Sequence, residues 1–268
     1  MKKALLYLLL ALGISIAVLL LGGALMGFVA GFIDGFNESH PGTTSSVNLM
    51  TYGGMLIALV LCLVLHWVFL HFGFSSYSAG RIPKPLRWKV LLGVMMAMGG
   101  LALLVCVLYN PIAPYDGTML TESDDSVRSA YIWMKNHPIQ SLLVLAAIEM
   151  TANMVLCGAV LRELLEWKHY PVIIINVYAL VMALVSGLFS NPVLMIPSLM
   201  TAQVEAWTYE YSRSIIPVII GDIFYWVVMF CLMGISFSGW WYLVACIIIL
   251  PSIFYVIKVM EPYKPIDN

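Results

Sequence analysis

Charged side chains are scarce in this chain. Only 10% of its 268 residues are Asp, Glu, Lys or Arg, while 62% are hydrophobic, and the mean hydropathy is +0.96. A soluble domain is closer to half apolar and a quarter charged. So few charges cannot cover the surface of a soluble globule of this size, and the composition predicts a protein of the lipid bilayer.

Several functional signatures are also missing. The sequence contains no P-loop, dinucleotide-binding fingerprint, HExxH or GxSxG pattern, so no cofactor is expected. A net charge of -1 gives no attraction for nucleic acid. No hydrophilic block is long enough to fold separately, and we expect a single membrane domain over residues 1–268. The cysteines lack paired metal-ligand spacing and indicate neither a zinc site nor a disulfide frame: Cys62, Cys106, Cys157, Cys231 and Cys246.

Long apolar stretches are abundant instead. A helix that crosses the bilayer needs about 20 mostly apolar residues. The sequence predicts an all-α bundle of eight transmembrane helices at about residues 4–33, 50–73, 88–110, 139–161, 171–190, 193–209, 214–234 and 239–258. The sixth is the weakest, because it is short and carries Gln203 and Glu205. The start of the chain imitates a signal peptide, but its apolar run is too long, and we expect a retained first helix.

The positive charges indicate the orientation of these helices. With both termini in the cytoplasm, most lysines and arginines face inward, as the positive-inside rule requires. Only Arg128 and Lys135 then face out. The cytoplasmic set is Lys2, Lys3, Arg81, Lys84, Arg87, Lys89, Arg162, Lys168, Arg213, Lys258 and Lys264. Cytosolic loops of modest length suit a bacterial inner membrane.

A glycine stripe runs along the first helix. Gly23, Gly27 and Gly31 are four residues apart, and Gly35 continues the series. Glycines on one helix face allow another helix to approach closely. The pattern predicts close helix contact, either inside the monomer or in a homo-oligomer.

Ionisable residues inside the expected spans are the candidate functional residues, because burying them in a bilayer is costly. Glu149 lies midway along the fourth span and Asp222 lies in the seventh. Glu205 is expected near the cytoplasmic end of the sixth span, where it can reach water. His66 and His71 do not share a helix face and are interpreted as structural. For the two deep acids, a structural hydrogen-bonded role and a functional role both stay open.

One segment resembles a known family of membrane proteases. Residues 146–165 read AAIEMTANMVLCGAVLRELL and resemble the first motif of the CPBP family, which includes CAAX-processing and bacteriocin-processing enzymes. Gly158 matches the family glycine. The family's pair of glutamates falls on Ala152 and Asn153, and its arginine falls on Cys157.

Two further motifs continue the resemblance. The second family motif, a phenylalanine followed by a histidine, corresponds to ALVSGLFSNP, where Val185 and Phe189 occupy the two positions. The third corresponds to residues 214–226, SIIPVIIGDIFYW. There the histidine position holds Asp222 and the asparagine position holds Trp226. The resemblance covers about residues 85–235 and lacks the polar signature of the family.

The resemblance implies an eight-helix scaffold without the standard chemistry. In the family, glutamates and histidines are thought to activate a water that attacks a peptide carbonyl, which requires a base. Alanine and phenylalanine cannot take a proton, and an asparagine amide is no base. We therefore expect a catalytically degenerate protein that binds a membrane partner, a peptide or a lipid.

Two alternatives stay open. One is an active intramembrane endopeptidase with a shifted site that uses Glu149 and Asp222. The other is a small proton-linked transporter. In each case we expect both acids to share a polar pocket with Asn153, which lies one helical turn after Glu149.

Overall fold

The chain forms a bundle of helices in the computed structural model, which describes residues 2–39, 46–72, 88–109, 132–167, 170–189, 194–237 and 239–259. All regular elements in these ranges are helices. They are α1 (Lys2–Ser39), α2 (Ser46–His71), α3 (Trp88–Leu108), α5 (Pro138–Val155), the π-helix η1 (Leu156–Leu161), α6 (Arg162–Trp167), α7 (Pro171–Phe189), α8 (Met195–Ser212), α9 (Ile216–Leu232) and α10 (Trp240–Val259).

The helices are apolar enough for a membrane protein. In the described part of the chain, four segments have the length and composition to cross a bilayer: Lys2–Val29, Tyr52–His71, Trp88–Leu108 and Pro138–Glu166. Three shorter apolar segments lie in α7, α9 and α10. Each of the eight expected spans corresponds to a helical segment in the described structure. The fourth segment consists of α5, η1 and α6, which follow one another without a break.

Several of the expected boundaries are wrong. The first span was expected to end at residue 33, yet α1 continues to Ser39. The fourth span was expected to end at residue 161, yet the helix continues to Trp167. An ion pair explains this in part, because Arg162 and Glu166 are one turn apart, with 3.0 Å between Nε and Oε1. The sixth helix was expected to end at residue 209, yet α8 extends to Ser212 and ends at Arg213, which has a left-handed φ of 53°.

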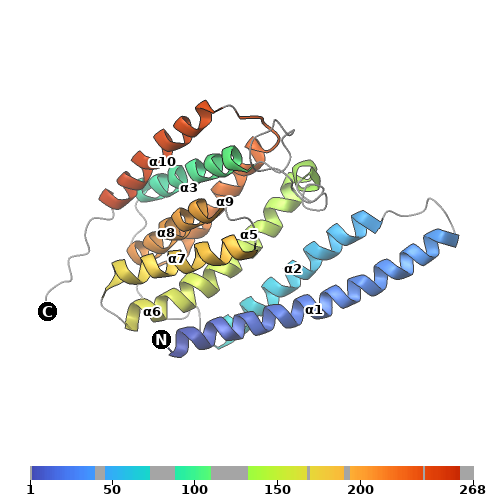
Figure 1. Cartoon of the computed structure of the whole chain (residues 1–268). Coiled ribbons are helices and arrows are strands. Elements are labelled where there is room, and N and C mark those ends of the chain that lie inside the picture. The colour runs from blue at the N-terminus through green and yellow to red at the C-terminus, as the bar shows by residue number, and fades with distance from the viewer. Residues whose placement is uncertain are drawn as a thin grey trace.

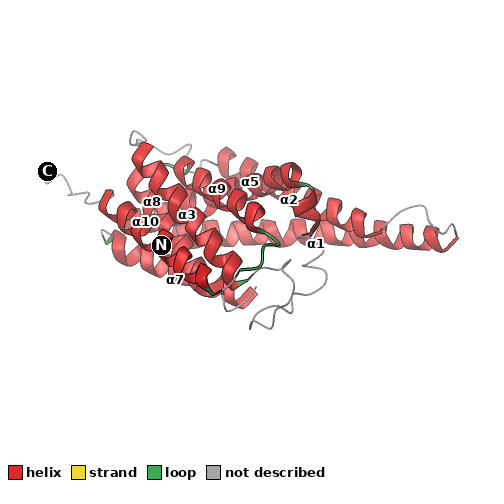
Figure 2. Cartoon of the chain, turned by 90° about the horizontal axis from the view of Figure 1, so that it is seen from above, coloured by secondary structure: helices red, strands yellow, loops and turns green. Residues whose placement is uncertain are grey.

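The helices pack as one bundle with a hairpin at its edge (Figure 1). Helix α3 lies between α10, α9 and α8, and α7 packs on α8. Helices α1 and α2 form the hairpin and contact α5 and η1. Seen from above, the last part of α1 extends past the other helices (Figure 2).

Side-chain contacts define one end of the bundle, which we call the Pro138 end. The rings of Tyr52, at the start of α2, and Trp133, just before α5, meet edge to face with centroids 5.3 Å apart. The Lys135 ammonium donates a hydrogen bond of 2.7 Å to the carbonyl oxygen of Met233, which follows α9. The starts of α2 and α5 and the end of α9 therefore lie together.

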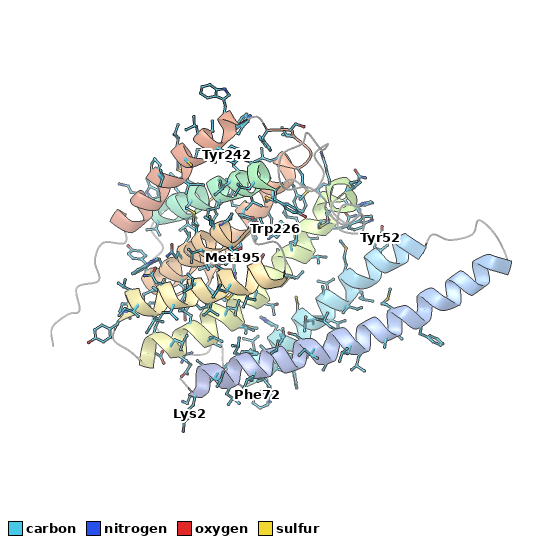
Figure 3. The ribbon with its side chains drawn as sticks, in the orientation of Figure 1. Lys2, Tyr52, Phe72, Met195, Trp226 and Tyr242 are labelled. Carbon is cyan, nitrogen blue, oxygen red and sulfur yellow. The ribbon has the colours of Figure 1, made fainter. Side chains whose placement is uncertain are left out.

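We call the opposite end of the bundle the Lys2 end. The start of α1, the end of α2 and α6 lie there together. Tyr7 in α1 contacts Phe69 near the end of α2, with ring centroids 6.4 Å apart. Helix α1 also contacts α6 and η1. Figure 3 shows Lys2 and Phe72 at one end of the hairpin and Tyr52 at the other.

The described part of the glycine stripe makes no close contact with another helix of the described structure. A Cβ atom added at Gly23, Gly27 or Gly31 would meet no heavy atom of the described residues within 4 Å. The close approach of α1 and α2 occurs one residue away, at Gly22, where a Cβ would lie 2.8 Å from the side chain of Ile57. The hairpin therefore leaves the stripe open to its surroundings.

Candidate functional site

A cavity of about 350 Å³ lies inside the bundle, between α3, α5, α7, α8 and α9. Three carboxyl groups from three helices line it: Glu149 of α5, Glu205 of α8 and Asp222 of α9. The other lining residues are Met98, Val105, Tyr109, Met182, Leu194, Pro197, Ser198, Thr201, Ala202, Tyr225, Trp226 and Met229. No Lys, Arg or His is among these residues. We call it the carboxyl cavity.

The three acids lie at similar depth. Glu149 and Glu205 are eleven and ten residues after the starts of α5 and α8, and Asp222 is ten residues before the end of α9. At about 1.5 Å per residue, each lies about 15–17 Å from the Pro138 end of its helix. That depth is about half of a hydrocarbon layer of about 30 Å.

Asn153 joins α5 to α9. Its Nδ2 donates a hydrogen bond of 2.6 Å to Oδ2 of Asp222 and one of 2.9 Å to the backbone oxygen of Glu149. Both side chains are buried, with 4% of Asn153 and 3% of Asp222 exposed. Gly221 supports this register, since a Cβ there would lie 2.8 Å from Val94 of α3. The amide therefore satisfies a carboxyl group that has little access to solvent.

Glu149 is held by a neutral donor. The indole Nε1 of Trp226 donates a hydrogen bond of 2.9 Å to Oε1 of Glu149. Trp226 lies one turn after Asp222 on α9, so the same face of α9 contacts both Asn153 and Glu149. This bond orients the Glu149 carboxyl without supplying a counter-charge.

The carboxyl groups of Glu205 and Asp222 are neighbours in the cavity. Two carboxylates have only acceptors, so a hydrogen bond between them would require a proton on one of the two. Acids placed in this way can titrate as a coupled pair.

A π-helical segment follows the site directly. The Cys157 thiol, in η1, donates a 3.7 Å hydrogen bond to Oδ1 of Asn153. Six residues in π-helical form are uncommon, and such segments often occur at functional sites. Cys157 lies four residues after Asn153, on the same side of the helix, and both are buried.

Of the predicted site residues, Glu149 and Asp222 line the carboxyl cavity, and Asn153 lies beside it, hydrogen-bonded to Asp222. That these residues form a functional site stays a prediction. The structure adds Glu205, which was expected near a helix end. Because α8 continues to Ser212, Glu205 lies in the helix interior. Comparing the position of Glu205 along its helix with the positions of Glu149 and Asp222 would have identified it as a third acid at the same depth.

Other predicted positions lie elsewhere. Val185 is 44% exposed and points out of the bundle, and the side chain of Phe189 lies outside the described residues. Ala152 lines a different groove, of about 480 Å³, which is mostly apolar and lies between α1, α2 and α5. His71 is exposed and stacks on Trp67, with ring centroids 5.3 Å apart. Of the family motif positions Ala152, Asn153, Val185, Asp222 and Trp226, only Asp222 and Trp226 line the cavity.

The carboxyl cavity is suited to binding or to proton exchange. Within the described ranges, no group of three His, Cys, Asp or Glu side chains is spaced to hold a metal ion. The acids are paired with an amide, an indole and each other, so they can accept hydrogen bonds or protons from a ligand.

Comparison of the chain with protein-family models, with curated proteins and with solved structures found no match.

Proposed function

We propose that the chain spans the membrane eight times with both termini in the cytoplasm. The described residues contain eight successive long helical segments, and their contacts suit an alternation between the Lys2 end and the Pro138 end. Lys2 and Lys3 lie at the Lys2 end, which would be cytoplasmic by the positive-inside rule. Under this proposal the carboxyl cavity lies near the membrane midplane.

Cysteine labelling tests this topology. In a background without the native cysteines, single cysteines at Lys3, Lys84 and Lys264 should react with an impermeant thiol reagent only from the cytoplasmic side. A cysteine at Asp124 should react only from the outside. Positions 84, 124 and 264 lie outside the described residues, so the test is independent of the structure. Labelling of position 124 from the cytoplasm, or of 264 from outside, would reject the proposed topology.

We propose that the protein binds a membrane lipid or peptide in the carboxyl cavity and is a catalytically degenerate relative of the CPBP proteases. The observation that carries the binding proposal is a cavity of about 350 Å³ at half depth, lined by acids on three helices. Its volume is at the lower end of the range for ligand pockets. The degenerate relationship is supported by three residues at family motif positions that lie in one site: Asn153 bonds to Asp222, and Trp226 bonds to Glu149.

Two alternatives have specific support. The proximity of the Glu205 and Asp222 carboxyl groups in the cavity favours a proton-linked transporter, because a coupled pair can load and release a proton. The common cavity of Glu149 and Asp222 would also suit a shifted protease site, in which one carboxyl acts as acid and the other as base. Either alternative requires Glu149→Gln or Asp222→Asn to abolish the activity, which is pH-dependent uptake in the first case and cleavage of a membrane substrate in the second.

Filling the cavity tests the binding function. Thr201 lines the carboxyl cavity and is half-buried, so Thr201→Trp should occupy the space without disrupting the helix contacts. We expect any lipid or peptide that co-purifies with the wild-type protein in mild detergent to be lost, as measured by native mass spectrometry.

A matched control uses the apolar groove between α1, α2 and α5. Ala58→Trp adds the same side chain to a half-buried residue of that groove and should leave the bound molecule in place. If Thr201→Trp retains the molecule and Ala58→Trp loses it, the binding site is the apolar groove and the proposal is wrong.

A further inference from the structure

We propose that the carboxyl cavity recognises an organic cation, an ammonium group attached to a small apolar body. The inference rests on the proposed binding function and names the chemical class of its ligand. It follows from the charge of the cavity, from the chemistry of the remaining lining and from the route by which a ligand reaches the acids.

Acidic side chains line the cavity, and no basic side chain of the described residues lines it with them. Glu149, Glu205 and Asp222 come from three helices, and the side-chain donors that bond to Glu149 and Asp222 in the described structure are neutral: the Trp226 indole and the Asn153 amide. Among the lining residues there is no Lys, Arg or His. Buried charges in proteins are normally paired, so a ligand ammonium would supply the counter-charge that the lining residues do not.

The rest of the lining suits an apolar body next to that charge. The rings of Tyr109, Tyr225 and Trp226 line the cavity, and aromatic faces attract cations. Several methionines and aliphatic residues complete it: Met98, Met182, Met229, Val105 and Leu194. Methionine adapts to irregular apolar shapes. Together these side chains favour an amine with an aromatic or aliphatic group over a bare, strongly hydrated ion.

The lining residues also mark a route to the acids. Tyr109 directly follows the end of α3, and Leu194 directly precedes the start of α8. Both positions belong to the Pro138 end, while the acids lie about 15 Å deeper along their helices. The cavity therefore extends from that end of the bundle to half depth, and a ligand would enter from there with its ammonium group leading.

Titration with a matched pair of probes tests this inference on the full-length protein in phosphatidylglycerol nanodiscs. Benzylamine is protonated at neutral pH, and benzyl alcohol has nearly the same shape without the charge. Calorimetry should show benzylamine binding at least 10-fold more tightly than benzyl alcohol. Glu149→Gln and Asp222→Asn should each weaken benzylamine at least 10-fold and leave benzyl alcohol unchanged.

Control variants separate charge in the cavity from charge elsewhere. Glu166→Gln removes an acid on α6 that lies outside the cavity, and it should leave benzylamine affinity unchanged. The two acid variants are independent of each other, so the test stays decisive if one of them does not fold. Repeating the titration with phosphatidylethanolamine in the nanodiscs shows whether the natural cation is a lipid headgroup or a free amine. Competition by that lipid identifies the headgroup as the natural cation, while unchanged affinity identifies a free amine, and both results support the inference.

Two results would overturn the inference. Equal affinities for the two probes would mean that the cavity selects shape and not charge. Benzylamine binding that is insensitive to both acid variants would place the amine elsewhere. Neither result affects the loss of a co-purifying molecule in Thr201→Trp, so the broader binding function is tested separately from the class of its ligand.

Discussion

Replacing Asn153 with leucine is expected to lower the free energy of unfolding by about 2–3 kcal/mol, because it leaves the buried Asp222 carboxyl without its amide donor. Replacing both partners with leucine should recover most of that loss, since no buried polar group of the pair is then left unsatisfied. Reversible unfolding in detergent, analysed as a double-mutant cycle, gives the coupling energy.

The cycle also has a clear contrary outcome. If the double variant loses as much stability as the two single variants together, the amide and the carboxyl do not interact, and the link between α5 and α9 is not the one described. Replacing Thr151, whose hydroxyl donates a hydrogen bond to the carbonyl oxygen of Ala147 within α5, provides a comparison on the same helix. Thr151→Ala should cost about 1 kcal/mol or less.

Replacing Gly100 with leucine is expected to destabilise the bundle by about 3 kcal/mol or more. A Cβ at this buried position of α3 would lie 2.9 Å from Cγ1 of Ile249 and 3.4 Å from that residue's backbone nitrogen, so α10 would have to move. Overpacking of a core contact typically costs about 1–3 kcal/mol, and backbone displacement adds to it. A lowered melting temperature in detergent is the measurement.

The glycine stripe supplies the control for this variant. Gly27→Leu adds the same side chain where no described atom lies within 4 Å, so the melting temperature of the monomer should not change. A change of oligomeric state in Gly27→Leu alone would support contact between two copies through Gly23, Gly27, Gly31 and Gly35. Equal melting temperatures for Gly100→Leu and Gly27→Leu would contradict the described packing of α3 on α10.

Much of the architecture follows from the sequence alone. Each expected span corresponds to a helix, because a long apolar run has only one way to satisfy its backbone in a bilayer. Prolines mark several starts, with Pro138 and Pro171 opening α5 and α7 and Pro217 near the start of α9. The scarcity of charge made the few acids within spans visible as candidates, and Glu149 and Asp222 were found in this way.

Only the tertiary structure decided which of these residues act together. Hydropathy gives the position of a residue along a helix but not the partner it faces, so neither the Trp226 bond to Glu149 nor the place of Glu205 could be read from it. The four-residue spacing likewise placed the glycine stripe on one face of α1, but it could not show which residue meets α2. Gly22 makes that contact instead. Packing sets the rotation of each helix about its axis, and that rotation depends on neighbours far away in the chain.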